Sequence, residues 1–319
     1  MSWEPTASIH HLKQRARIIA QIRDFFAKKN VLEVETPILG RGTIPDPNIQ
    51  SISTQIKGCH NETFYLQTSP EFPMKRLLCA GIGSIYQICK AFRDGEAGTR
   101  HNPEFTMLEW YREGFDHHAL MDEIDELLAA ILNLPKSKRF SYREVFLHYL
   151  DIDPFTATID LLKQCAEKQN LGNLESLKGE DKDTWLTFLI SYCIEPKLGF
   201  DAPVFIYDFP PNQAALARIR NDKNPVAERF ELFIQGMELA NGFHELGDAN
   251  EQRMRFENDL KKRAASNQNL VAIDENLLVA LSHGFPECAG VAIGVDRIMM
   301  LATKTKNIAD VIAFPVTHV

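Results

Sequence analysis

Residues 92–109 read FRDGEAGTRHNPEFTMLE, and this stretch has two strand-like segments on either side of a polar loop that contains glycine. The alternating flanks predict a β-hairpin with strands over 85–93 and 104–111. Arg93 closes the first strand, Arg100 lies in the loop and Phe105 opens the second strand. Cations suit phosphate oxygens and a flat ring suits a base, so the hairpin is a candidate nucleoside triphosphate site. A surface hairpin with solvated charges is the alternative, and the hairpin alone leaves it open.

A second informative segment lies near the C-terminus. Residues 290–297 read GVAIGVDR and are followed by the apolar run IMML. Small residues allow close approach of a ligand, and a turn into a helix presents free N–H groups and the positive end of the helix dipole. Arg297 at this helix start disfavours the dipole, so a bound ligand explains its position better than stability does.

A third segment, residues 31–39, reads VLEVETPIL. It is strand-like but contains Pro37, which predicts a strand at an edge, an end or an interface.

These three segments, in this order, resemble the three signature motifs of class II aminoacyl-tRNA synthetases. The stretches RHNPEFTM (100–107) and GFHEL (242–246) are most similar to the lysyl branch, and the resemblance runs from about Ile9 to Pro315. Lysyl-tRNA synthetases carry an additional N-terminal β-barrel that reads the anticodon. The first helix expected here starts at residue 9, so we expect a single catalytic domain over 1–319. The family with this combination is that of the elongation factor P lysine ligases.

The pattern of elements predicts an α+β fold, in which an antiparallel sheet is flanked by helices and a helical insertion spans about 117–200. Helices are expected over 9–28, from the Ser69-Pro70-Glu71 start (with Ser69 as N-cap) to Gly81, over 248–266 with a capping box of Asp248 and Glu251, and after Asp274. Further strands are expected over 64–67, 204–209, 229–233, 236–242 and 311–314.

The resemblance implies a set of ATP-binding residues. Arg93 would contact the α-phosphate, Arg100 the terminal phosphates, and Phe105 and Arg297 the two faces of adenine. The remaining implied contacts are Asp94, Gly95, Asn102, Glu238, the backbone near Leu239, and Gly294. Gly95 stands where relatives carry a glutamate that contacts ATP, and Glu96 follows it.

The resemblance also implies acidic residues for Mg²⁺ and for a lysine-like substrate, whose ammonium groups need partners in a closed pocket. Glu238 and Glu245 are the metal candidates. Glu71 would meet the amino group nearer the carboxylate, and Glu109, Tyr111 and Glu245 the distal one, which leaves Glu245 open between metal and substrate. Further pocket residues would be Ser69, Pro70, Asn241, Phe243 and Ala292.

Ala292 stands where lysyl-tRNA synthetases carry glycine. Its methyl group would crowd an α-amino group and favour an isomer with the amine on the β-carbon. This agrees with (R)-β-lysine, the substrate that the family resemblance implies.

Composition narrows the possible partners. The 319-residue chain carries a net charge of −8, so broad phosphate-backbone binding and stable tRNA binding are not expected. The six cysteines show no C-x-x-C pairing, which is typical of reduced thiols in a cytoplasmic protein. No signal sequence or membrane-length apolar run is present in the sequence. No His/Cys cluster suggests zinc, and His101 and His244 are interpreted as residues with structural or loop hydrogen bonds.

The resulting hypothesis is a homodimeric ligase that uses ATP to adenylate (R)-β-lysine and transfers the lysyl group to a lysine side chain of elongation factor P. One alternative is a truncated synthetase that aminoacylates tRNA. Another is a non-catalytic regulatory paralogue, which the presence of Arg93, Arg297, Glu238 and Glu245 disfavours.

Overall fold

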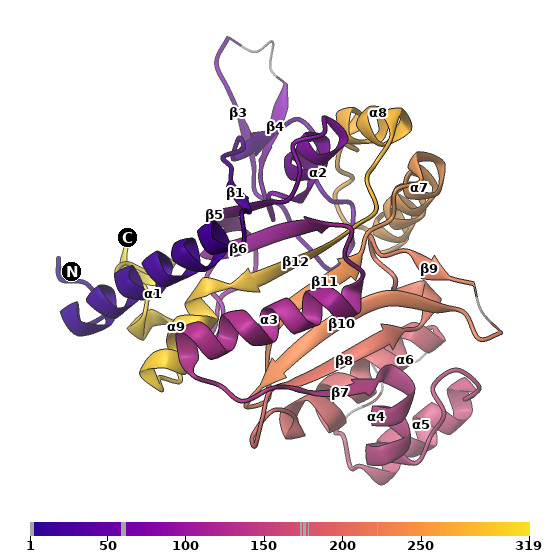
Figure 1. Cartoon of the computed structure of the whole chain (residues 1–319). Helices are drawn as coiled ribbons and strands as arrows, with labels where there is room; N and C mark the ends of the chain where they lie inside the picture. Colours follow the sequence, from indigo (N-terminus) through magenta and orange to yellow (C-terminus); the bar gives the residue numbers. More distant parts are fainter. Residues whose placement is uncertain (1–2, 59–61, 173, 175–176, 178, 222) are drawn as a thin grey trace. The chain divides into compact units, whose positions relative to one another are not determined.

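The computed structural model describes residues 3–58, 62–172, 174, 177, 179–221 and 223–319 (Figure 1). The chain divides into two compact units. Unit 1 comprises Met1–Phe115, Ala130–Leu132 and Leu246–Val319, and unit 2 comprises Asp116–Ala129 and Asn133–Glu245. In both units the strands are mostly antiparallel and are accompanied by helices, which confirms the α+β prediction.

The strands of unit 1 follow the order β1 (Leu32–Glu33), β5 (Ile85–Phe92), β6 (Glu104–Glu113) and β12 (Cys288–Gly294). β5 and β6 form the predicted antiparallel hairpin, from Ile85 opposite Tyr111 to Phe92 opposite Glu104. β12 pairs antiparallel with the other edge of β6, whereas β1 pairs parallel with β5. A small separate sheet contains β2 (Leu39–Gly40), β4 (Thr63–Leu66) and β3 (Ser53–Gln55).

Three helices of unit 1 start where the sequence predicts a helix, and each of the three has a side-chain cap. Ser8 accepts a hydrogen bond from the His11 N–H and begins α1 (Ile9–Lys28), which buries Phe26 in a stacked contact with Tyr86. Asp248 and Asp274 cap α7 (Ala249–Ala265) and α8 (Glu275–His283). α2 (Glu71–Cys79) packs with α8 (Figure 1), and α9 (Val295–Thr303) follows β12 directly.

Three local predictions for unit 1 are wrong. The strand over 31–39 is interrupted between β1 and β2, because Pro37 has no N–H to donate to a ladder. The N-cap of α2 is Pro70 rather than Ser69, although Ser69 Oγ accepts from the Glu71 N–H at 3.4 Å. Residues 311–314 form no strand, since the carbonyls of Ile312 and Ala313 accept hydrogen bonds from Thr6 instead.

The strands of unit 2 follow the order β11 (Met237–His244), β10 (Val226–Ile234), β8 (Val204–Phe209) and β7 (Lys138–Ser141), and β9 (Ile219–Arg220) also pairs with β10. The predicted strand 204–209 is confirmed, and β10 and β11 are longer than expected. The segment about 117–200 contains α3 (His117–Leu132), α4 (Tyr142–Leu150), α5 (Ile159–Lys168) and α6 (Lys182–Leu189). Its helical character is confirmed, but strand β7 within it was missed.

In the core of unit 2, α4 packs against strand β8 and α5 packs against α6 (Figure 1). Phe146, Leu162 and Trp185 are buried there together with Ile206 and Phe233 of the strands. A capping box of Ser141 and Glu144 starts α4 directly at the end of β7, which explains how strand and helix follow one another without a loop.

Candidate active site

In unit 1, three neighbouring strands place a buried acid beside a small residue. Glu109 of β6 lies opposite Gln87 of β5 on one side and opposite Ala292 of β12 on the other. Residues opposite one another in antiparallel strands share a face of the sheet. The Tyr111 hydroxyl donates to Glu109 Oε1 at 2.7 Å, and Glu109 is only 3% exposed. The structure therefore brings the predicted residues Glu109, Tyr111 and Ala292 together on one face, where a buried carboxylate suits a cation.

Strand β12 contributes small residues to this face. Gly290 lies opposite Tyr111 and Gly294 opposite Met107, so both share the face of Ala292. Ala292 and Gly294 are partly exposed, whereas Val291 and Ile293 on the opposite face are buried. The alternation places Gly290, Ala292 and Gly294 of β12 on the face that carries Glu109.

The two predicted catalytic arginines already have aromatic or imidazole neighbours. The Arg93 guanidinium lies 5.3 Å from the centre of the Phe105 ring, and its Nη1 is 3.7 Å from Glu96. Arg297 Nη2 lies 2.7 Å from His101 Nε2. Because arginine only donates, His101 Nε2 must accept here and carry its proton on Nδ1. His101 thus makes the loop hydrogen bond expected for it.

The loop of the hairpin uses several predicted ATP-binding residues to fix its own backbone. Asp94 Oδ1 accepts from the Gly95 N–H at 2.9 Å, and Gly95 has a φ of 76° that favours glycine. Asn102 is buried, donates to the Glu104 carbonyl at 2.6 Å and accepts from the Val316 N–H at 3.0 Å. Arg100 is exposed. Asn102 therefore orders the loop from within the chain.

Glu71 begins helix α2 and has a cationic neighbour that the sequence analysis missed. Lys75 Nζ lies 2.7 Å from Glu71 Oε1, and Lys75 is 1% exposed. Glu71 and Lys75 are four residues apart in a predicted helix, and this spacing could have indicated the ion pair from the sequence. Pro70 is buried and Ser69 is partly exposed just before the helix. A substrate ammonium at Glu71 would share this carboxylate with Lys75.

In unit 2, a β-bulge determines which residues of β11 share a face. Leu232 lies opposite Ala240 but Phe233 lies opposite Glu238, so Leu239 is an extra residue on β11. The bulge moves Glu238 to the face of Asn241 and Phe243, and these three residues are partly exposed while Leu239 is buried. Glu245 continues the same alternation beyond the strand end. The predicted residues of β11 thus point to one side, except Leu239, which was predicted only through its backbone.

Two more carboxylates belong to this face and were missed from the sequence. Glu231 lies opposite Asn241 and pairs with Arg229. Burial raises the pKa of Glu231, and the charges of Glu238 and Glu195 raise it further, whereas Arg229 lowers it. Burial and Glu238 likewise raise the pKa of Glu195. Mutual repulsion among carboxylates is relieved by a cation. The alternation of side chains along β10 and β11 could have indicated Glu231 from the sequence. No sequence pattern connects Glu195 to these strands.

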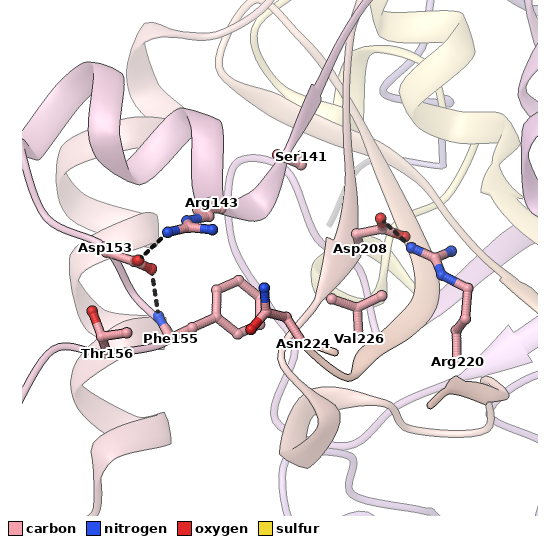
Figure 2. Close-up of a pocket in the computed structure, with 9 residues that line it drawn as sticks. All are labelled: Ser141, Arg143, Asp153, Phe155, Thr156, Asp208, Arg220, Asn224 and Val226. Carbon is pink, nitrogen blue, oxygen red and sulfur yellow. Dashed lines mark hydrogen bonds and ion pairs between the residues drawn. The ribbon is translucent and has the colours of Figure 1, made fainter. Parts of the chain in front are cut away.

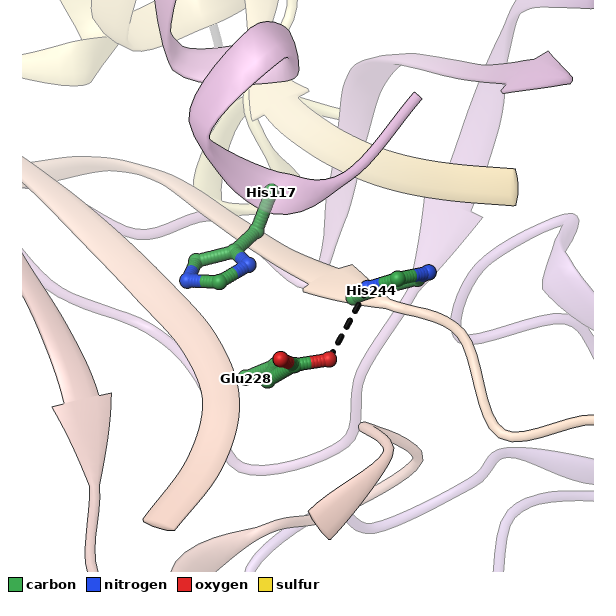
Figure 3. A group of neighbouring side chains, drawn as sticks. All are labelled: His117, Glu228 and His244. Carbon is green, nitrogen blue, oxygen red and sulfur yellow. Dashed lines mark ion pairs between the residues drawn. The ribbon is translucent and has the colours of Figure 1, made fainter. Parts of the chain in front are cut away.

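Unit 2 also contains a histidine–carboxylate group that sequence reasoning missed. His117, Glu228 and His244 are buried, and one ligand-type atom from each lies within 4.8 Å of the others (Figure 3). They come from the start of α3 and from two strands, so no short spacing pattern in the sequence announces them.

A cavity of about 260 Å³ in unit 2 contains none of the predicted site residues (Figure 2). It is lined by Ser141, Arg143, Asp153, Phe155, Thr156, Asp208, Arg220, Asn224 and Val226. Arg143 pairs with Asp153 at 2.6 Å and Arg220 with Asp208 at 2.8 Å. The charges that line the cavity are therefore compensated within the chain.

Comparison with known proteins places the chain in a family. The family model of class II tRNA synthetases (D, K and N) matches residues 3–318, and the chain belongs to this family. Among its relatives, the elongation factor P–(R)-β-lysine ligase of Photobacterium profundum is 50% identical over 317 residues, which cover 98% of both chains. The enzymes of the same name from Photorhabdus laumondii and Yersinia enterocolitica are each 50% identical, over 99% of this chain and 98% of theirs. The resemblance to the elongation factor P lysine ligases is thereby confirmed.

Among the described residues, no helix is both long enough and apolar enough to cross a membrane.

Proposed function

We propose that the chain is an ATP-dependent ligase that adenylates (R)-β-lysine and transfers the lysyl group to a lysine side chain of elongation factor P. The observation that carries this proposal is the near-full-length identity of about half with relatives that bear the name of this activity. Aminoacylation of tRNA by a truncated synthetase is the alternative, and the names of these relatives do not favour it.

The proposed reaction has two steps. A carboxylate oxygen of the amino acid attacks the α-phosphorus of ATP, and diphosphate leaves. The neutral ε-amine of the acceptor lysine then attacks the acyl carbon, AMP leaves, and the amine loses a proton as the amide forms. In both steps the enzyme must hold the reactants in line and compensate negative charge on the phosphate.

In this proposal Arg93 contacts the α-phosphate and Arg100 the terminal phosphates. Adenine stacks on Phe105, and Arg297 covers its other face. The exposed contact of Arg297 with His101 places its guanidinium beside the hairpin loop that carries Arg93 and Phe105. Asp94, Gly95 and Asn102 order the loop that carries these groups, and Gly294 leaves space beside them.

Mg²⁺ is proposed to bind at Glu238 and Glu245. The raised pKa values of Glu231 and Glu195, each caused in part by the charge of Glu238, support a cation on this face of β11. The ion would neutralise the phosphate charge of ATP. Carboxylates are the protein ligands that Mg²⁺ usually takes.

The substrate's amino groups are proposed to meet Glu71 and the Glu109–Tyr111 pair, with Glu245 as a second candidate for the distal group. The buried position of Glu109 supports this role, because a carboxylate in such a place is stabilised by a cation beside it. Ser69 and Pro70 precede Glu71, and Asn241 and Phe243 complete the predicted contacts. Ala292, opposite Glu109, would select the β-amine.

We further propose that the chain acts as a single catalytic domain over 1–319, in a homodimer, in the cytoplasm and without stable tRNA binding. The match of one family model over residues 3–318 supports the single domain. The acidic balance of the chain, with a net charge of −8, supports a protein acceptor rather than tRNA.

The test is a reaction of the full chain with ATP, Mg²⁺ and labelled (R)-β-lysine, with either elongation factor P or tRNA as acceptor. The proposal expects label on the protein in an alkali-stable bond. Label on tRNA that mild alkali releases, with none on the protein, would establish the alternative.

A further inference from the structure

A group of charged side chains, three of them buried, lies directly beside Glu245 and has no part in the proposed chemistry. We call it the Glu228 cluster, and its members are His117, Asp208, Arg218, Arg220, Glu228 and His244, all within unit 2. Glu228 is 5% exposed. Its Oε2 lies 2.9 Å from His244 Nδ1 and accepts from Arg218 Nε at 2.9 Å, and its Oε1 accepts from Arg220 Nη1 at 3.3 Å. Glu228 thus joins three different side chains.

The backbone connects the same cluster to Glu245. The Arg218 N–H donates to the His244 carbonyl at 2.8 Å, and the Glu228 N–H donates to the Arg218 carbonyl at 2.9 Å. Ala217 forms a β-bridge with Glu245 itself. Arg218 is therefore fixed to Glu228 through both its side chain and its backbone, while its backbone also holds the end of β11, where Glu245 begins.

His117 and Asp208 of the cluster make fewer side-chain hydrogen bonds than Glu228 does. His117 is 2% exposed, and neither of its ring nitrogens makes a hydrogen bond in the part of the chain that the structure describes. Its Nε2 lies 3.6 Å from Asp208 Oδ1, and Asp208 has a φ of 58°, which is uncommon for a residue other than glycine. Arg220 bonds both Asp208 and Glu228.

The histidine–glutamate group in Figure 3 has the residue types of a metal site, but its charges argue for another role. The carboxylates of Asp208 and Glu228 are balanced by the guanidinium groups of Arg218 and Arg220. Both oxygens of Glu228 are already engaged by arginines. A divalent cation between His117, Glu228 and His244 would bring uncompensated positive charge to a buried place, which is costly.

We propose that Glu228 is a positioning residue for Glu245, acting through His244 and Arg218. The inference rests on the proposed function, in which Glu245 binds Mg²⁺ or the distal ammonium group of the substrate. Glu228 contacts the ring of His244, the residue before Glu245. It also binds the side chain of Arg218, whose backbone N–H donates to the His244 carbonyl. Partners that orient a ligand residue in this way are typically needed for full metal affinity or activity.

The main test is Glu228→Gln, which keeps the size of the side chain but removes its charge. Pyrophosphate exchange, normalised to active sites by adenylate burst, gives the half-saturating Mg²⁺ concentration and the KM for (R)-β-lysine. We expect at least one of the two to rise by about 10-fold or more. Amide hydrogen exchange of residues 239–246, measured by mass spectrometry, should also become faster. Arg218→Gln, at a half-exposed residue, serves as a second variant with the same expected direction if Glu228→Gln folds poorly.

Asp125→Asn is the matched control. Asp125 also accepts three hydrogen bonds, from the Ser137 N–H, the Ser137 hydroxyl and Arg139, and these partners lie in β7 or just before it. This variant should lose stability and keep both kinetic constants and the exchange of 239–246.

Unchanged kinetic constants in Glu228→Gln and Arg218→Gln would overturn the inference, whatever their loss of stability. An equal rise of these constants in Asp125→Asn would overturn it as well. If the wild-type chain showed no (R)-β-lysine-dependent pyrophosphate exchange, the proposed function would fail instead. Amide hydrogen exchange alone would then decide whether Glu228 positions Glu245. An exchange rate of residues 239–246 in Glu228→Gln equal to that of the wild type would contradict this role of Glu228.

Discussion

Ala292 and Glu109 lie directly opposite one another on neighbouring antiparallel strands, so a methyl group and a buried carboxylate share one face of the sheet. If Glu109 binds an ammonium group, the methyl of Ala292 limits where the rest of the amino acid can lie. Ala292→Gly should therefore raise kcat/KM for α-lysine relative to (R)-β-lysine. One methyl group in a pocket is worth about 1–3 kcal/mol of discrimination. Pyrophosphate exchange with both isomers measures the ratio, and an unchanged ratio would place the selectivity elsewhere.

The Glu109–Tyr111 pair should matter for binding of the amino acid. Glu109→Gln removes the charge but keeps an oxygen that can accept from the Tyr111 hydroxyl. We expect the KM for (R)-β-lysine to rise by about 10-fold or more, because a charge-assisted contact contributes roughly 1.5–3 kcal/mol. Tyr111→Phe should have a smaller effect. A Glu109→Gln enzyme with the wild-type KM would remove Glu109 from the substrate site.

Arg93 and Arg297 should be needed for adenylation. Replacing either with Ala should lower amino-acid-dependent pyrophosphate exchange by about 10²–10³, the usual effect of losing one preorganised charge contact in a catalytic site. Arg112→Ala is the matched control, since Arg112 also covers an aromatic ring, that of Phe115 at 4.8 Å, but was not predicted to bind substrate. Wild-type exchange in a folded Arg93→Ala enzyme would contradict the assignment.

The Glu228 cluster should contribute to stability in a pH-dependent way. Burial alone would raise the pKa of Glu228, but its contacts with His244 and Arg218 lower it from 4.5 to about 2. Since the folded pKa is depressed, the stabilisation is complete above the unfolded value and is lost as pH falls toward about 2. Urea unfolding of wild type and Glu228→Gln should therefore differ most at pH 6–7 and progressively less from about pH 5 to pH 3. A difference that stays constant over this range would show that the charge of Glu228 is not the cause.

Much of the fold follows from local sequence signals. Ser8, Asp248 and Asp274 cap helices where the sequence predicts them, and the alternation around 92–109 gives the hairpin correctly. The strands predicted over 31–39 and 311–314 are wrong, because local side-chain patterns do not show which backbone groups can form a ladder. Pro37 interrupts one ladder, and the carbonyls of the other segment bond to Thr6, which is some 300 residues away in the sequence.

Candidate site residues could be named from the sequence where they belong to one motif, as Arg93, Phe105 and Glu109 do. They could not be named where long-range packing brings residues together. Lys75 beside Glu71 was within reach of helical spacing, but His117 beside Glu228 and His244 depends on the tertiary fold. The bulge at Leu239, which moves Glu238 to the face of Asn241, depends on strand register, which side-chain patterns alone do not reveal.

The central claim concerns the acceptor, and intact mass spectrometry of elongation factor P before and after reaction with the chain, ATP, Mg²⁺ and (R)-β-lysine tests it most directly. The transfer needs a neutral ε-amine, so its rate should increase with pH as the acceptor lysine loses its proton. We expect elongation factor P to gain the mass of one lysyl unit, in an amide that survives mild alkali. No mass gain on elongation factor P, with alkali-labile label on tRNA instead, would contradict the account.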